Sequence, residues 1–273
     1  MTYIQLIAQL KEIGASAPSH EAFEILRVCC GLSREWCLAN RDRELPSQIE
    51  SILSLRRSGV PLQYILGEAW FYGYRFIVNT DCLIPQPDTE HAVAAALKCL
   101  PPTGTLLDLC TGSGCIPIAV LNESPSASAV ALEISKGAIA VAAKNANLHS
   151  VTDRLTIVEA DVLHDDISAF MAKADVITSN PPYINTSILD DLPTEVRHEP
   201  RIALDGGADG MIFYRHFIAK LSLYMRSDAV MILEIGYDQA DRITKLCSAN
   251  HLSCKLHKDF GGNIRIAEIR KIK

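Results

Sequence analysis

The chain has 273 residues, of which 48% are hydrophobic and 21% are charged, and this composition excludes a disordered or fibrous protein. No apolar run approaches the roughly 20 residues that span a bilayer, so we expect no membrane association. The formal net charge of −6 argues against a tight nucleic-acid binder, because the affinity of such proteins comes largely from Lys and Arg contacts to phosphate.

The N-terminal segment does not have the composition of a secretory signal. Gln5, Gln9, Lys11 and Glu12 lie within a helical pattern, without a basic n-region or a small-residue cleavage site. The nine cysteines include no Cys-x-x-Cys pair, so we expect no metal ion and reduced, mostly buried thiols. We therefore expect a cytoplasmic protein.

Residues 1–75 have the pattern of a small helical domain. Leu6 and Leu10 recur at helical spacing in the first of its predicted helices. The segment Ser47–Glu50 predicts a capping box at the start of a later helix, and Gly59 is suited to end that helix.

A β-hairpin linker is expected at residues 76–90. Aromatic residues crowd around Gly67 and Gly73 just before it, and Ile77–Asn79 has the character of a strand. We interpret the aromatic stretch and the linker as a hairpin that joins two domains, although packing in a core explains the aromatic residues equally well.

Strand-like and helix-like segments alternate in residues 91–273. The expected strands are Thr105–Leu109, Ser128–Leu132, Leu155–Val158, Asp175–Thr178, Ala229–Ile235 and, at an edge, Asn263–Ile269. His91–Leu100 and Ser135–Leu148 are expected to be helices. This alternation predicts an α/β fold with a mostly parallel sheet covered on both faces.

A glycine-rich turn, Asp108–Cys115, follows the first predicted strand of this sheet. Gly112 and Gly114 allow a tight turn and let a ligand approach the backbone. A dinucleotide fingerprint needs a third glycine where Pro117 stands, and no phosphate-binding lysine follows. These departures argue against a nicotinamide-dependent oxidoreductase and predict a ligand without a pyrophosphate.

Two carboxylates follow at the ends of the next strands. Glu133 can accept hydrogen bonds from ribose hydroxyls, and Asp161 can accept from an adenine amino group. Either residue alone could simply face solvent. Together with the glycine turn, they predict adenosine without phosphates, which fits S-adenosyl-L-methionine as the cofactor.

The tetrad Asn180-Pro181-Pro182-Tyr183 follows the fourth strand and resembles the motif of amino-methyltransferases. A conjugated NH2 group is weakly nucleophilic, so catalysis depends on holding it in line with a methyl donor. The Asn180 side-chain oxygen and the Pro181 carbonyl can each accept one N–H, and the prolines stiffen the turn. Tyr183 offers a flat face for the amide. The tetrad alone does not distinguish adenine, cytosine and glutamine.

Further segments have a recognisable family pattern, namely Pro61–Gly67, Phe71–Gly73, Leu83–Glu90, Leu107–Ile116, Ser179–Ile184, Glu199–Gly207 and Glu234–Gly236. Through these segments the chain resembles, over nearly its full length, the HemK-like family of release factor glutamine methyltransferases. Two positions depart from the family pattern: Gln86 replaces the usual arginine of Pro-Arg-Pro, and Glu133 stands where many members have aspartate.

The resemblance implies a helical N-terminal substrate-recognition domain, a β-hairpin and a Rossmann-like methyltransferase domain with a seven-stranded sheet. It also implies methylation of the side-chain nitrogen (N5) of the glutamine in the Gly-Gly-Gln motif of peptide chain release factors. We expect a monomer that does not contact nucleic acid directly; the alternative is a DNA or RNA amino-methyltransferase acting on adenine N6.

The candidate site residues fall into two overlapping sets. The expected cofactor-binding residues are Asp108, Cys110, Thr111, Gly112, Ser113, Gly114, Glu133, Asp161, Val162 and Asn180. The expected substrate-binding residues are Asn180, Pro181, Pro182 and Tyr183, of which Asn180, Pro181 and Tyr183 are expected to be catalytic. A catalytically silent cofactor-binding protein is a further alternative, which the intact tetrad disfavours.

Overall fold

The computed structural model describes residues 1–259 and 261–272, and the chain divides into two compact units. Unit 1 comprises residues 1–68 and 193–198, and unit 2 comprises residues 69–192 and 199–273. Within the described residues, no helix combines the length and the apolar character that crossing a membrane requires.

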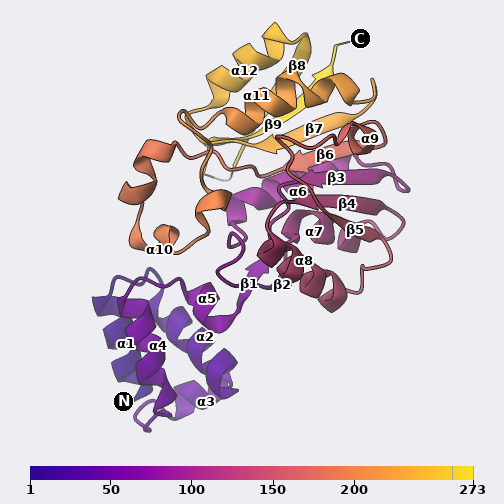
Figure 1. Ribbon diagram of the computed structural model, residues 1–273. Helices are drawn as coiled ribbons and strands as arrows, with labels where there is room; N and C mark the ends of the chain where they lie inside the picture. The colour runs from indigo at the N-terminus through magenta and orange to yellow at the C-terminus, as the bar shows by residue number, and fades with distance from the viewer. Residues whose placement is uncertain (260, 273) are drawn as a thin grey trace. The chain divides into compact units, whose positions relative to one another are not determined.

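Unit 1 is a bundle of short helices around one apolar core (Figure 1). Its helices are α1 (Tyr3–Glu12), α2 (Pro18–Cys30), α3 (Arg34–Ala39), α4 (Gln48–Arg57), α5 (Leu62–Leu66) and α10 (Thr194–Arg197). The core is built from side chains at helical spacing, such as Leu6, Leu10 and Leu53, which are fully buried. The helical pattern predicted for this part of the chain is therefore confirmed.

The predicted capping box at Ser47–Glu50 is wrong. Ser47 already has helical backbone angles (φ −61°, ψ −24°), and its side chain forms no capping hydrogen bond. An N-cap residue normally needs an extended backbone to aim its side-chain oxygen at the first turn. The capping box lies instead at Thr2 and Gln5, whose side chains each accept a hydrogen bond from the other residue's backbone N–H.

A buried ion pair crosses the core of unit 1. Arg56 Nε lies 2.5 Å from Glu21 Oε1, and these two side chains are only 6% and 11% exposed. Arg56 also donates to the Val60 carbonyl oxygen and pairs with the exposed carboxylate of Glu195 in α10. The second half of the chain thus contributes α10 to the first unit.

The hairpin lies earlier in the chain than expected. Its strands are β1 (Glu68–Phe71) and β2 (Tyr74–Ile77), whereas we expected a hairpin at 76–90. Tyr72 and Gly73 supply the left-handed turn residues, with φ of +52° and +78°. Phe71 and Phe76 are buried in the core of unit 2, so the aromatic residues both form a hairpin and fill a core.

Unit 2 contains a seven-stranded sheet with the order β5-β4-β3-β6-β7-β9-β8. The strands are β3 (Thr105–Leu109), β4 (Ser128–Glu133), β5 (Leu155–Glu159), β6 (Val176–Ser179), β7 (Val230–Glu234), β8 (Leu252–Lys258) and β9 (Ile264–Lys271). The pairs from β5 to β7 are parallel, and β9 runs antiparallel to both of its neighbours. The predicted α/β fold with a mostly parallel sheet is confirmed, but β9 is not an edge strand, because β8 pairs beyond it.

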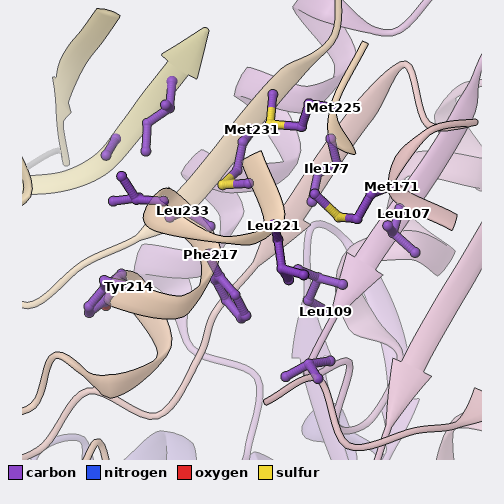
Figure 2. Close-up of a cluster of buried hydrophobic side chains, with 14 of the residues drawn as sticks. Leu107, Leu109, Met171, Ile177, Tyr214, Phe217, Leu221, Met225, Met231 and Leu233 are labelled. Atoms are coloured by element: carbon purple, nitrogen blue, oxygen red, sulfur yellow. The ribbon is translucent and has the colours of Figure 1, made fainter. Parts of the chain in front are cut away.

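Helices cover both faces of this sheet (Figure 1). One face carries α6 (Glu90–Cys99), α7 (Cys115–Glu123) and α8 (Lys136–Leu148), and the other carries α9 (Ser168–Met171), α11 (Ile212–Ala219) and α12 (Ala240–Ala249). The 3-10 helices are η1 (Pro87–Thr89), η2 (Thr186–Asp191), η3 (Arg201–Ala203) and η4 (Leu221–Tyr224). Figure 2 shows the second face, where Phe217 and Tyr214 from α11 meet Leu233 and Met231 of β7. The two packed cores fix the strand ends, and these position the site.

We predict that Arg56→Ala destabilises unit 1 by about 2–4 kcal/mol, because it leaves the Glu21 carboxylate buried without its partner. Urea unfolding followed by the fluorescence of Trp36, in a Trp70→Phe background, measures this change, since the chain has two tryptophans. The matched control is Arg57→Ala on the same helix, where the side chain is exposed and the expected change is within about 0.5 kcal/mol. Equal effects of the two substitutions would contradict the role of the ion pair.

Candidate active site

A cavity of about 250 Å³ lies at the carboxyl ends of the parallel strands. Its walls include the turn after β3, Glu133 at the end of β4, Asp161 after β5 and Asn180 after β6. The chain runs from β3 outward to β4 and β5 and then returns to β6 on the other side of β3. Ligands of open α/β sheets bind at such a reversal of strand order.

The structure brings most of the predicted site residues to this one cavity. Its walls include Cys110, Thr111, Gly112, Ser113, Glu133, Asp161, Val162, Asn180 and Pro182. Asp108, Gly114, Pro181 and Tyr183 lie next to these residues in the sequence but do not line the cavity. These four residues can therefore affect a bound ligand only by supporting the residues that line the cavity or through their backbone atoms.

The glycine-rich turn has the left-handed backbone that its sequence requires. Gly112 and Gly114 have φ of +57° and +78°, and Cys110 between β3 and the turn has φ of +60°. A Cβ atom on Gly114 would lie 3.1 Å from Ile118 and 3.3 Å from Ala142, so this glycine also lets α7 and α8 pack closely. The tight turn places the backbone of Gly112 in the cavity wall.

Glu133 ties the end of β4 to the glycine-rich turn. Its Oε2 accepts from the Gly112 N–H at 2.8 Å, and its Oε1 accepts from the N–H groups of Ile134 and Ser135 at 3.0 and 2.9 Å. A carboxylate offers about four acceptor positions. Three backbone N–H groups bind this side chain, so about one acceptor position is left for a ligand. The sequence had predicted that Glu133 accepts from both hydroxyls of a ribose.

Asp161 is held by its own turn. Its Oδ1 accepts from the Leu163 N–H at 2.9 Å, and its Oδ2 lies 2.8 Å from the imidazole of His164. Burial would raise the pKa of Asp161, but the bonds from His164 and Leu163 outweigh it and lower the pKa. The side chain is therefore a charged acceptor beside the cavity.

Asp108 lies behind the cavity wall and is fully buried. Burial raises the pKa of its carboxyl group to about 7, although the Thr178 hydroxyl donates to its Oδ1 at 2.6 Å. Among the residues that the structure describes, its Oδ2 forms no hydrogen bond of normal geometry, although the nearby Thr111 hydroxyl also lowers its pKa. A buried acceptor left over beside a pocket fits a ligand that carries positive charge or N–H donors.

Asn180 lines the cavity, and its amide orientation is fixed. Its Nδ2 donates to Thr89 Oγ1 at 3.1 Å, so its Oδ1 faces away from Thr89. The two prolines that follow are buried. An oxygen acceptor on a stiff turn is the arrangement that the tetrad predicts.

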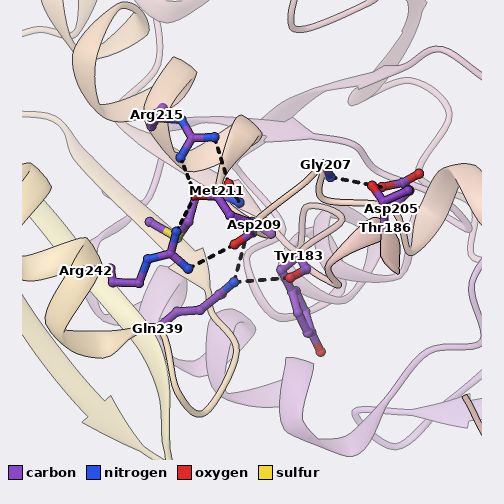
Figure 3. A network of polar contacts seen from close by, with 10 residues as sticks. Tyr183, Thr186, Asp205, Gly207, Asp209, Met211, Arg215, Gln239 and Arg242 are labelled. Atoms are coloured by element: carbon purple, nitrogen blue, oxygen red, sulfur yellow. Dashed lines mark hydrogen bonds and ion pairs between the residues drawn. The ribbon is translucent and has the colours of Figure 1, made fainter. Parts of the chain in front are cut away.

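Tyr183 is anchored through its backbone. Its carbonyl oxygen accepts from Gln239 Nε2 at 3.2 Å (Figure 3). A Cβ atom on Gly206 would lie 2.7 Å from the Tyr183 Cα. Burial raises the pKa of its phenol well above the ordinary value, so the hydroxyl keeps its proton. The glycine-rich loop after the tetrad is thus packed against the tetrad itself.

The loop after the tetrad is also tied to the segment before η1. Glu199 Oε2 accepts from the Ile84 N–H at 2.9 Å, and burial raises the pKa of Glu199 to about 7. Ile184 forms a parallel bridge with Asp205, supported by hydrogen bonds of 2.9 and 2.8 Å to Leu204 and Gly206. These contacts hold the walls of the cavity together.

Some cavity residues were not predicted as site residues. They include Asp81, Cys82, Leu83, Pro85, Gln86 and Thr89 before α6, and Ile202, Ala203 and Phe213 after the tetrad. Several of them lie in the segments Leu83–Glu90 and Glu199–Gly207, which carry the family resemblance, and this resemblance could have identified them as site residues. Gln86, which replaces the arginine of the family pattern, donates a hydrogen bond to the Ile84 carbonyl oxygen at 3.0 Å. It therefore stabilises the local backbone of its own segment.

Comparisons with known proteins agree with this geometry. The chain matches the family models "Methyltransferase small domain" over residues 88–199 and "PrmC N-terminal domain" over residues 3–67. It is similar to the release factor glutamine methyltransferase of Geobacter sulfurreducens, with 38% identity over 94% of this chain and 91% of that protein.

Two further matches bear on specificity and on the fold. A ribosomal protein uL3 glutamine methyltransferase of Bordetella pertussis is 38% identical over 72% of this chain and 68% of its own length. The solved structure of the Methanocaldococcus jannaschii tRNA m1G37 methyltransferase has a TM-score of 0.52 at 18% identity, over 76% of this chain and 56% of that one. This last likeness shows a shared fold.

We predict that Glu133→Gln weakens binding of S-adenosyl-L-methionine about 10- to 100-fold, because the NH2 group of glutamine cannot accept from the backbone donors that hold Glu133, and the acceptor left for a ribose hydroxyl loses its charge. Isothermal titration calorimetry measures the dissociation constant. The matched control is Glu159→Gln, whose exposed carboxylate lies opposite Glu133 on β5. Binding by Glu133→Gln at the wild-type level would contradict the assignment.

The raised pKa of Glu199 predicts a pH-dependent stability difference. Between about pH 4.5 and pH 7 the folded protein binds this proton more tightly than the unfolded chain, so its contribution to stability falls as pH rises. Glu199→Gln keeps an acceptor for Ile84 but does not titrate. Its free energy of unfolding, measured in urea, should gain about 1–3 kcal/mol relative to wild type between pH 5 and pH 8. A constant difference across this range would contradict the prediction.

Proposed function

The chain belongs to the family of release factor glutamine methyltransferases, and on that premise we propose that it transfers a methyl group from S-adenosyl-L-methionine to the N5 nitrogen of the glutamine in the Gly-Gly-Gln motif of a peptide chain release factor. The observation that carries the proposal is Asn180, whose fixed carboxamide shares a cavity wall with Glu133 and Asp161.

The residues around the cavity fit the cofactor. Glu133 would hold the ribose, Asp161 with Val162 would hold the adenine, and the Gly112 backbone allows close approach. When bound, the cofactor supplies an electrophilic methyl group on a sulfonium. The unpartnered, buried oxygen of Asp108 favours positive charge nearby.

The chain's own residues supply orientation. A carboxamide nitrogen is weakly nucleophilic, because its lone pair is conjugated with the carbonyl group. Asn180 Oδ1 and the Pro181 carbonyl would each accept one of its N–H groups and stabilise the positive charge that develops on nitrogen. Tyr183 would support the planar amide from beside the wall.

The partners and the division of labour follow from the same proposal. We infer that the substrate is a release factor, that unit 1 contributes to its recognition, and that the enzyme acts as a cytoplasmic monomer without direct contact to nucleic acid. Unit 1 matches the "PrmC N-terminal domain" model over residues 3–67, so it is part of what this chain shares with that family.

A second candidate substrate is ribosomal protein uL3. The relative from Bordetella pertussis is as similar to this chain as the first relative, at 38% identity, although over a shorter length. Both substrates present a glutamine side chain, so the tetrad serves either. The match of the Geobacter sulfurreducens release factor enzyme to 94% of this chain, against 72% for the uL3 enzyme, favours the release factor.

We predict a gain of one methyl group, about 14 Da, on the Gly-Gly-Gln peptide of a release factor incubated with this protein and S-adenosyl-L-methionine. Asn180→Ala should lower kcat about 10²- to 10³-fold, because an acceptor aligned with the reacting nitrogen is lost. Mass spectrometry of the digested release factor measures both.

The matched control is Asn147→Ala, because Asn147 is an exposed asparagine on α8. This variant should methylate the release factor at the wild-type rate. Methylation of uL3 but not of the release factor would transfer the proposal to the second substrate. Labelling of adenine in DNA or RNA, without labelling of either protein, would overturn it.

A further inference from the structure

Three side chains from distant parts of unit 2 form a hydrogen-bonded chain that ends at the tetrad. Asn180 Nδ2 donates to Thr89 Oγ1 at 3.1 Å, and Thr89 Oγ1 donates to Glu234 Oε2 at 2.6 Å. Asn180 follows β6, Thr89 ends η1 and Glu234 ends β7. Thr89 and Glu234 are each 2% exposed, so water does not compete for these bonds.

The direction of these bonds is determined by the number of protons. A hydroxyl group has one proton to donate, and an ionised carboxylate can only accept. The Thr89 proton is therefore committed to Glu234, which leaves Thr89 Oγ1 as an acceptor. Only the NH2 end of the Asn180 carboxamide satisfies that acceptor.

The orientation of Asn180 matters because the two ends of a carboxamide have opposite hydrogen-bonding character. With nitrogen toward Thr89, Asn180 presents an oxygen acceptor elsewhere. A half-turn about χ2 would present NH2 instead, and a substrate NH2 group would then meet a donor. Sterically the two orientations are nearly equivalent, so a hydrogen-bond partner must select between them.

We propose that Thr89 and Glu234 are positioning residues that select the orientation of Asn180 in which its oxygen accepts from the substrate amide nitrogen. This inference rests on the proposed function for its effect on catalysis. The orientation itself is a property of the protein without substrate.

Glu234 is held firmly and is surrounded by few charges. Its backbone carbonyl accepts from the Tyr214 hydroxyl at 2.8 Å. The charged groups that face its carboxyl group are Asp88 from η1 and Arg265 from β9, and Arg265 is itself bound to Asp88 and Asp259. The other titratable groups nearby are Tyr183 after β6, Tyr214 on α11 and Cys115 on α7, and burial raises the pKa of each.

Protonation of Glu234 would undo the selection. Burial, opposed by the hydrogen bond from Thr89, raises the pKa of Glu234 to about 7; within this balance Asp88 contributes to the rise and Arg265 opposes it. A protonated Glu234 can donate to Thr89, which frees the Thr89 proton to bind Asn180 Oδ1 and stabilises the unproductive orientation. Methylation should therefore decline as pH falls through about 7.

Substitutions at Thr89 test the hydroxyl. Thr89→Val keeps the shape and removes both bonds, so kcat should fall about 10- to 100-fold, with a smaller change in KM. Thr89→Ser keeps the hydroxyl and should retain kcat within about threefold. Wild-type kcat in Thr89→Val would overturn the proposal.

A substitution at Glu234 tests the charge and serves if Thr89→Val does not fold. Glu234→Gln does not titrate, and its side-chain NH2 group can donate to Thr89 as a protonated carboxyl group does, so the selection of the Asn180 orientation is weakened at every pH. Its kcat should therefore fall below that of wild type at pH 8, without the further decline that wild type shows toward pH 6. Persistence of the same decline in Glu234→Gln would overturn the proposal.

A measurement without substrate separates this inference from the proposed function. In protein labelled with [¹⁵N]asparagine, the side-chain NH2 signal of Asn180, assigned with Asn180→Ala, should exchange slowly with solvent and shift between pH 6 and pH 8. Thr89→Val should remove both features. If wild type methylates no glutamine yet shows this signal, the proposed function fails and the orientation stands; a fast-exchanging, pH-independent signal overturns the orientation.

Discussion

The candidate site depends on the hydrogen bond that fixes the Asn180 carboxamide at the end of β6. A planar amide nitrogen offers little basicity, so an enzyme that methylates it gains most from holding it in line with the donor. Holding requires acceptors that do not rotate. The buried position of β6, the two prolines and the bond to Thr89 each remove a freedom that Asn180 would otherwise have.

Hydrogen bonds in the surrounding loops hold the cavity walls in place around Asn180. Glu133 joins the end of β4 to the turn after β3, and Gln239 joins the Tyr183 carbonyl to the loop at Gly210. Glu133 and Gln239 both bind backbone groups through their side chains. These hydrogen bonds hold the loops in place without a salt bridge between the loops. Buried carboxyl groups lie close to this arrangement, and burial raises the pKa of Asp108, Glu199 and Glu234 to about 7. Burying a carboxyl group costs stability when it is ionised, and such perturbed groups are typical of functional sites.

The sequence predicted the sheet closely and the details of capping poorly. Strands such as Thr105–Leu109 are short apolar runs between turn residues, a strong local signal. The capping box failed at Ser47, because a cap depends on the backbone angles of one residue, which composition does not reveal. The edge of the sheet was misplaced, because β8 contains two lysines and a histidine and has a weak strand pattern, yet it pairs with β9.

The candidate site shows the same division. The positions of Gly112 and Glu133 in the cavity wall could be predicted, since a tight turn needs glycine and the second predicted strand was expected to end at this edge of the sheet. The roles of Thr89 and Glu234 were not, because they lie 91 positions before and 54 positions after Asn180, and only the folded sheet brings them together.

A crystal structure of this protein with a Gly-Gly-Gln peptide and the demethylated cofactor tests this role of Asn180 most directly. We expect the glutamine side-chain nitrogen to lie within about 3 Å of both Asn180 Oδ1 and the Pro181 carbonyl oxygen. A glutamine nitrogen bound elsewhere, or an Asn180 carboxamide turned with its nitrogen toward the peptide, would contradict it.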